Sequence, residues 1–147
     1  MFRRMLVPTD GSELSTNSAK AAISLAKESG AAVVVLNVQP VYRPPVVAEV
    51  PVADVYSQDE YEAGALEVAN KALAEVAALA SAAGVECRTV AQLDSSPYEA
   101  IIRVARDEGC DLIFMASHGR RGMASLLLGS ETQKVLTHCK IPVLVYR

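Results

Sequence analysis

Two kinds of segment alternate along the chain: short uninterrupted apolar runs, and longer stretches in which apolar residues recur at helical spacing. The runs lack polar alternation, which is typical of parallel strands covered on both faces. They are Met5–Val7, Val33–Val38, Leu112–Ala116 and Val143–Tyr146, with a weaker run at Arg88–Leu93. We therefore predict five buried strands.

The stretches between these runs have the spacing of helices. In the first, Ala19, Ala22, Ile23 and Ala26 fall on one face, and Gly30 is placed to end the helix. The others are Leu66–Ala83 before Gly84, Tyr98–Ala105 before Gly109, and a short helix from about Gly129 to Thr137. Four helices are expected.

The third helix has a recognisable start. Ser96 and Glu99 are spaced as in a capping box, in which each side chain accepts a hydrogen bond from the other residue's main-chain N–H. Pro97 suits the first helical position, because proline has no N–H and the N–H at that position would have no acceptor within the helix. The sequence predicts a helix that begins at Pro97 and is capped locally.

Strand and helix alternate strictly, which favours a parallel sheet with right-handed crossovers and helices on both faces. No repeat or linker divides the 147 residues, so we predict one α/β domain over residues 1–147. Gln39–Gln58 alone escapes the pattern, because its four prolines exclude a regular helix. This segment is predicted to be a loop or lid.

The amino-acid composition limits the class of protein, its cellular location and its partners. The chain is 51% hydrophobic and 21% charged, which excludes a disordered chain, and no apolar run approaches the roughly 20 residues of a membrane span. No secretory signal is recognisable, so a cytoplasmic protein is expected. The net charge of −3 argues against a nucleic-acid partner. The three cysteines lack metal-ligand spacing, and free thiols with no metal site are predicted.

Candidate chemistry lies in two loops that follow strands. Pro8–Ser12 follows the first strand, and Ala116–Gly122 follows the fourth. Ligands of open α/β sheets bind beyond the carboxyl ends of the strands, and glycines and helix N-termini offer main-chain N–H groups to phosphate. The segment Ser117–Lys140 carries a net charge of +3 in this acidic chain. A local anion site is therefore plausible, with solvated loop charges as the alternative.

Three segments, MLVPTDGS, VVVLNV and MASHGRRGMASLLLGSETQKVLTHCKIPVLVYR, resemble the universal stress protein family, and the match in element order covers essentially the whole chain. The resemblance implies a Rossmann-like three-layer sandwich whose five-stranded parallel sheet has the order 3-2-1-4-5. It also implies a homodimer built through the last strand, Ile141–Tyr146. An edge strand with unpaired main-chain groups invites such pairing.

Nucleotide-binding members of this family share a pattern of glycines that holds ATP across the sheet. Here nine residues separate Gly119 from Gly129 and Ser130, as in that pattern, but Ala116 replaces its first glycine. The extra methyl group is expected to shift the ligand slightly or to weaken binding. The ligand implied is ATP, AMP or ADP, with Mg²⁺ held mainly by phosphate oxygens.

The resemblance also implies roles for single residues. Asp10, with Pro8 and Thr9, would lie against the nucleoside, and Val38 would present main-chain groups to the adenine edge. Ribose and phosphates would be surrounded by Ala116, Gly119, Arg120, Gly129, Ser130 and Thr132. A carboxylate at Glu131 is expected to repel a triphosphate unless a metal intervenes.

Other interpretations stay open. Asp10 could simply cap the first helix or a turn, and Ser130 could be only the N-cap of the last helix. We assign no catalytic residue, and His118 is expected to have a loop or packing role. The function favoured is that of a stress-response protein regulated by nucleotide occupancy. The alternatives are a dimeric interaction protein that binds no nucleotide, and a slow ATP hydrolase.

Overall fold

All nine predicted elements are present in the computed structural model, which describes residues 1–44, 57–120 and 127–147. In chain order they are β1 (Arg4–Pro8), α1 (Glu13–Ser29), β2 (Ala32–Gln39), α2 (Gln58–Ala83), β3 (Cys87–Leu93), α3 (Pro97–Asp107), β4 (Leu112–Ala116), α4 (Ser130–His138) and β5 (Val143–Tyr146). The strands agree with the apolar runs to within one or two residues at each end.

The five strands form one parallel sheet in the order β3-β2-β1-β4-β5, which confirms the predicted fold class and strand order. The chain moves outward from β1 to β3, and then returns to place β4 on the other side of β1. The strand order therefore reverses between β1 and β4. The loops after these two strands leave the same edge of the sheet side by side.

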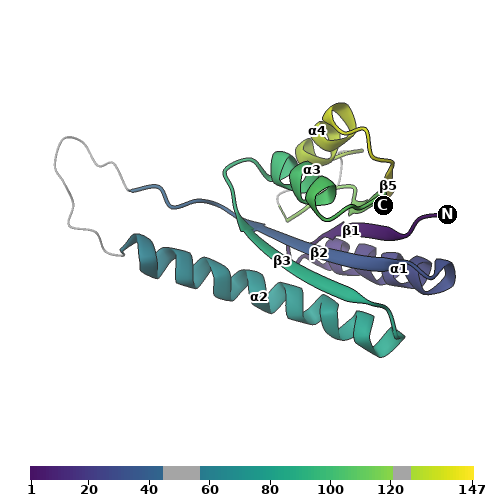
Figure 1. The fold of residues 1–147 in the computed structure, drawn as a ribbon. Helices are drawn as coiled ribbons and strands as arrows, with labels where there is room; N and C mark the ends of the chain where they lie inside the picture. Colours follow the sequence, from purple (N-terminus) through teal and green to yellow (C-terminus); the bar gives the residue numbers. More distant parts are fainter. Residues whose placement is uncertain (45–56, 121–126) are drawn as a thin grey trace.

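Helices cover both faces of the sheet, with α1 and α2 on one side and α3 and α4 on the other (Figure 1). One core lies under each layer: Val7, Val35 and Phe114 point into the core beneath α1 and α2, whereas Leu6 and Ile113 point into the core beneath α3 and α4. The three inner strands β1, β2 and β4 are buried on both faces, which is why they read as continuous apolar runs. The prediction of five buried strands is wrong for β3 and β5, which are the edges of the sheet and are only partly buried.

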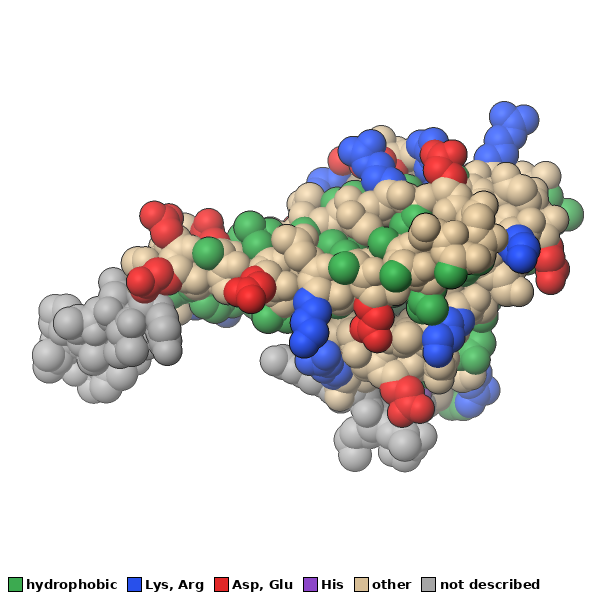
Figure 2. Space-filling view, turned by 90° about the horizontal axis from the view of Figure 1, so that it is seen from below, with side chains coloured by type: hydrophobic (Ala, Val, Ile, Leu, Met, Phe, Trp, Pro, Cys, Tyr) green, Lys and Arg blue, Asp and Glu red, His purple; other side chains and the backbone are tan. Residues whose placement is uncertain are grey.

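Helix α2 begins eight residues before the periodic stretch that predicts it, at Gln58. A capping box formed by Ser57 and Glu60 starts it, and its first turns are too polar to show an apolar face. These turns project beyond the sheet, and acidic side chains gather there (Figure 2). Gln39 and Gln58, the ends of the predicted loop, belong to β2 and α2, and residues 45–56 of that loop lie outside the described residues.

The predicted capping box of α3 is wrong. The Ser96 side chain caps no amide of the helix, and the Ser96 N–H donates instead to Asp94 Oδ1 at 2.8 Å. The amide that Glu99 would have reached is therefore occupied, and Glu99 Oε1 accepts from the Tyr98 hydroxyl at 3.1 Å. The Tyr98 N–H is capped by Glu131 Oε2 at 2.8 Å, a residue of α4.

Within the described ranges, no helix is both long and apolar enough to cross a membrane.

Candidate functional site

The loop after β1 is anchored inside the protein by Thr9, whose side chain is buried. Its N–H donates to Leu36 O at 2.8 Å, and its carbonyl accepts from Asn37 Nδ2 at 2.9 Å. Asn37 is only 1% exposed, and sequence reasoning missed it. The signal was present, because Asn37 is the one polar residue within the apolar run Val33–Val38.

Asp10 ties the two loops together. Its Oδ1 accepts from the Ser12 N–H at 2.9 Å, and its Oδ2 accepts from the Arg120 N–H at 2.7 Å. Partial burial by itself raises the pKa of the Asp10 carboxyl, but the hydrogen bonds from Ser12 and Arg120 outweigh it, and the pKa is lowered. Asp10 therefore stabilises its own turn and also holds the loop after β4, 110 residues away in sequence.

Gly119 and Gly129 occupy positions where a side chain would collide with the rest of the site. A Cβ on Gly119 would lie 2.5 Å from Asp10 Oδ2. A Cβ on Gly129 would lie 3.0 Å from the Cα and Cβ atoms of His118. The two motif glycines are thus required by close approach between loops, independently of any ligand.

Helix α4 starts without a side-chain cap. Gly129 is its N-cap, and Ser130 is the exposed first helical residue, so the interpretation of Ser130 as the N-cap is wrong. The first intrahelical bond runs from the Gln133 N–H to Gly129 O at 3.0 Å. The main-chain N–H groups of the first turn are left with no side-chain acceptor among the described residues, and they carry the positive end of the helix dipole.

Several groups of the predicted phosphate site point into the protein instead. The Gly129 N–H donates to Ser117 O at 2.6 Å, and the Arg120 N–H is held by Asp10. The buried Thr132 hydroxyl donates to Ala116 O at 3.1 Å. These contacts fix the shape of the loop after β4, and the first turn of α4 keeps N–H groups that no described side chain accepts.

Among the described residues, the Val38 N–H and C=O at the end of β2 have no main-chain partner on the side of β1. The Ala32 N–H donates to the carbonyl of Arg3, just before β1, and the Leu36 carbonyl accepts from the N–H of Thr9, just after β1. The even-numbered residues of β2 therefore direct their main-chain groups toward β1. Val38 must face the same way, beyond the end of β1 at Pro8. The next acceptor of the ladder, Thr9 O, is taken by the Asn37 side chain.

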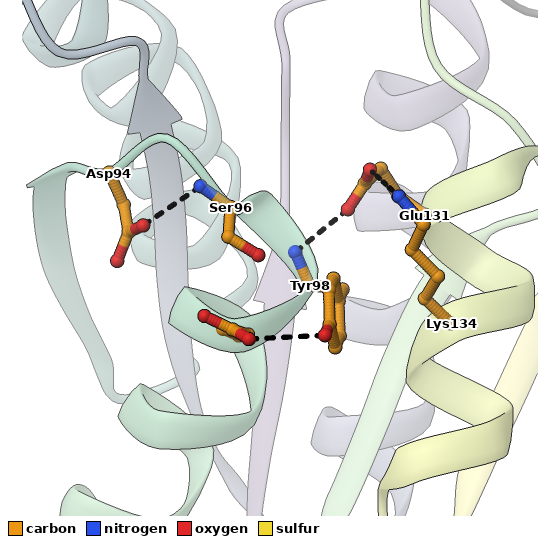
Figure 3. A network of polar contacts seen from close by, with 6 residues as sticks. Asp94, Ser96, Tyr98, Glu131 and Lys134 are labelled. Atoms are coloured by element: carbon orange, nitrogen blue, oxygen red, sulfur yellow. Dashed lines mark hydrogen bonds and ion pairs between the residues drawn. The ribbon is translucent and has the colours of Figure 1, made fainter.

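Glu131 is held between two helices (Figure 3). Its Oε2 accepts from the Tyr98 N–H at the start of α3, and its Oε1 lies 3.3 Å from Lys134 Nζ. The Lys134 ammonium also lies 5.6 Å from the centre of the Tyr98 ring. The carboxylate that we expected to oppose a triphosphate therefore has a structural role as the N-terminal cap of α3.

Arg120 and His118 flank the loop after β4. A guanidinium nitrogen of Arg120 would lie 3.0 Å from a Cβ placed on Gly11, so this cation stands over the loop after β1. His118 Nδ1 and the buried Ser117 hydroxyl form a hydrogen bond of 3.0 Å. His118 also packs against Gly129, a contact that agrees with a loop or packing role.

Comparison with known proteins identifies relatives over the full length. A family model described as the universal stress protein family matches residues 1–147. Universal stress protein MJ0531 of Methanocaldococcus jannaschii is 31% identical over 150 residues, and the alignment covers 100% of this chain and 83% of MJ0531. A universal stress protein of Thermus aquaticus is 34% identical over 150 residues, covering 100% of both chains.

Solved structures agree with these relatives. Protein MJ0577 superposes with a TM-score of 0.81 at 25% identity, over 99% of this chain and 95% of its own. A universal stress protein solved in complex with cAMP superposes with a TM-score of 0.71 at 25% identity, over 99% of this chain and 97% of that protein. The Archaeoglobus fulgidus universal stress protein in complex with dAMP superposes with a TM-score of 0.72 at 15% identity, over 99% of this chain and 98% of that protein.

Proposed function

The chain belongs to the universal stress protein family, and we propose that it binds an adenine nucleotide at the carboxyl ends of β1 and β4 and that occupancy of this site regulates its contacts with partners. The main-chain groups of Val38 carry the proposal. Among the described residues, the Val38 N–H and C=O have no main-chain partner on the side of β1, and such a donor and acceptor match the acceptor and donor along the edge of adenine.

The rest of the site provides for ribose and phosphate. The uncapped N-terminus of α4 offers N–H groups and a positive dipole end, and the Arg120 guanidinium adds a cation. Both Asp10 oxygens already accept N–H donors, so Mg²⁺ would arrive on the phosphates rather than on this carboxylate. Solved relatives in complex with cAMP and dAMP support an adenine nucleotide, with ATP as one candidate.

A homodimer through the last strand belongs to the same proposal. Among the described strands, β5 is an edge of the sheet that pairs with β4 alone, and Leu144 on it is 37% exposed. Pairing of two such edges would satisfy the unpaired main-chain groups of both. The strand begins at Val143 rather than Ile141, so the pairing surface is four residues long. We also infer a cytoplasmic setting, which the free thiols of Cys87, Cys110 and Cys139 support.

One alternative has an observation in its favour. The inward hydrogen bonds of the Arg120 and Gly129 N–H groups would be expected of a loop that serves structure only. They support the dimeric interaction protein that binds no nucleotide. Slow ATP hydrolysis has less support, because the contacts of Asp10 and His118 are those of positioned structural groups.

Substitution of Val38 tests the proposal. Val38→Pro removes an N–H that takes no part in the β2–β3 ladder, which uses the odd-numbered residues of β2. Calorimetric titration with AMP, cAMP and ATP should show at least a tenfold loss of affinity for all three, whereas the control Val38→Ala should stay within about threefold. Thermal melts report whether each variant folds. Equal affinity of both variants, or no binding by the wild type, would refute the site.

A further inference from the structure

We infer that Asn37 is a positioning residue of the nucleotide site: its side-chain amide keeps the Val38 N–H out of the sheet and thereby makes the site select adenine over purines that carry a carbonyl in place of the amino group. This role rests on the proposed function, to which it adds the base selectivity of the site. Three features support it: the hydrogen-bond pattern between β1 and β2, the contacts of the Asn37 amide, and the burial of Asn37.

The pairing of β1 with β2 directs the Val38 N–H at the Thr9 carbonyl. The two strands are parallel. At the start of the pair the Ala32 N–H donates to Arg3 O at 2.9 Å, and at its end the Thr9 N–H donates to Leu36 O at 2.8 Å. Because donors and acceptors alternate regularly along a parallel ladder, the next bond would join the Val38 N–H to Thr9 O. That bond is absent from the main-chain hydrogen bonds of the described residues.

The Asn37 side chain occupies the Thr9 carbonyl instead. Its Nδ2 donates to Thr9 O at 2.9 Å, and its Oδ1 accepts from Gln39 Nε2 at 2.8 Å. A carbonyl can only accept, so the nitrogen of the amide must be the atom that faces Thr9. Asn37 is 1% exposed within an otherwise apolar run, where an amide is stable only with such partners. A side chain thus ends the ladder, and Val38 keeps its N–H for another acceptor.

This N–H decides which base can pair with the end of β2. Adenine presents a ring nitrogen that accepts beside an amino group that donates, and the two complement the Val38 N–H and C=O. Hypoxanthine presents the reverse, a ring N–H beside a carbonyl oxygen, so that donor would face donor and acceptor would face acceptor. If the Val38 N–H were bonded to Thr9 O, the Val38 C=O alone would remain, and it would accept from either base. The selectivity for adenine therefore depends on the Asn37 amide.

The effect of Asn37 on Val38 is measured without nucleotide, by amide hydrogen exchange of the full chain followed by NMR. In the wild type the Val38 N–H should exchange at least about tenfold faster than that of Leu36, which is paired with β1. Asn37→Leu has the branched shape of asparagine but no donor, and should slow exchange at Val38 at least about tenfold, because the N–H can then bond Thr9 O. Asn70→Leu, the same substitution at an exposed position of α2, is the matched control and should leave Val38 unchanged.

The effect on base selectivity is measured by calorimetric titration with AMP and inosine monophosphate (IMP), which carry adenine and hypoxanthine on the same ribose phosphate. The wild type should bind AMP at least about tenfold more tightly than IMP. Asn37→Leu should lower this ratio to less than about threefold, mainly through weaker binding of AMP, whereas Asn70→Leu should keep it. A purely structural role of Asn37 would weaken both nucleotides alike and leave the ratio unchanged.

A second variant covers a loss of folding in Asn37→Leu. The hydroxyl of Asn37→Ser is one bond shorter than the amide, and this variant should change exchange at Val38 and the AMP-to-IMP ratio in the same direction. The role of Asn37 is overturned if the wild-type Val38 N–H exchanges as slowly as that of Leu36, or if the folded Asn37 variants keep the wild-type ratio. Equal binding of AMP and IMP by the wild type also refutes this role alone, whereas binding of neither refutes the proposed function and the selectivity with it.

Discussion

The helices of the two layers differ in how their N-termini are satisfied. On one face, α1 and α2 are capped by the serine that directly precedes each: Ser12 Oγ accepts from Ser15 N–H, and Ser57 Oγ accepts from Glu60 N–H. On the other face, α3 receives its cap from Glu131, 33 residues further along the chain, and α4 has no side-chain cap. Among the described helices, α4 follows the strand at the reversal of strand order and starts without a side-chain cap.

This difference separates scaffold from candidate site. A local serine cap accepts one of the free N–H groups at the start of a helix and contributes about 1 kcal/mol. A glycine at the same position leaves those groups unsatisfied, which costs stability unless water or an anion completes them. The entries to α1 and α2 are thus stabilised locally, whereas α4 keeps main-chain donors that no described side chain accepts.

The largest effect is expected from giving α4 a side chain at its N-cap. Gly129→Val places a branched side chain 3.0 Å from the His118 backbone, and should lower the free energy of unfolding by about 1–3 kcal/mol and abolish nucleotide binding. Urea denaturation and calorimetry measure the two effects. Gly64→Ala in α2 is the control, because an added Cβ there would lie within 4 Å of no described atom outside the helix backbone, and it should instead stabilise by about 0.5–1 kcal/mol. Unchanged affinity in the Gly129 variant would remove α4 from the site.

A smaller effect is expected at the entry to α1, with a dependence on pH. Because hydrogen bonds hold the pKa of Asp10 below its ordinary value, its carboxylate contributes stability at pH values above that ordinary value, and the contribution is lost as the pH falls through the lowered pKa. Asp10→Asn should therefore cost on the order of 1–2 kcal/mol at pH 7, from weaker hydrogen bonds, and less below about pH 4.

Urea denaturation of both proteins between pH 7 and pH 2.5 measures this difference. Asp111, whose pKa is also lowered by main-chain donors, lies at the opposite edge of the sheet and provides a comparison. If the free energies of unfolding of the wild type and of Asp10→Asn differ by the same amount at every pH down to 2.5, the role assigned to the carboxylate is contradicted.

The smallest effect on stability is expected at the start of α3. It compares Glu131, which caps this helix in the structure, with Glu99, which the sequence pattern indicates as part of the cap. Glu131→Ala removes the acceptor for the Tyr98 N–H, and should destabilise the protein by about 1 kcal/mol. Glu99→Ala, at the position that the sequence pattern indicates, should change stability by less than about 0.5 kcal/mol. Thermal unfolding of the two variants tests this contrast, which a reversed ranking would refute.

Much of the fold was predictable because its signals are local. The apolar runs predict β4 and β5 with their observed bounds, and Gly30 and Gly84 end their helices in the left-handed conformation, with φ of 69° and 72°. The polar first turns of α2 could not be predicted from apolar spacing. The strand order came from the resemblance to a family, since periodicity does not say which strands are neighbours.

At the candidate site, the sequence indicated the two loops, their glycines and Asp10, because turn residues after buried strands mark a ligand edge. It did not reveal that the Asn37 side chain takes the Thr9 carbonyl, the next acceptor in line for the Val38 N–H. It also misassigned the cap of α3. In each case the partner lies far away in the chain, where spacing carries no information.

The amino-acid sequence by itself determined which segments are strands and helices, because hydrophobic periodicity, glycine and proline act within a few residues. Which N–H groups remain free at the carboxyl edge was decided only by the tertiary structure. Hydrogen bonds such as those from Arg120 to Asp10 and from Tyr98 to Glu131 form only after packing brings distant loops together. Buried donors and acceptors take whichever partner the fold places within reach.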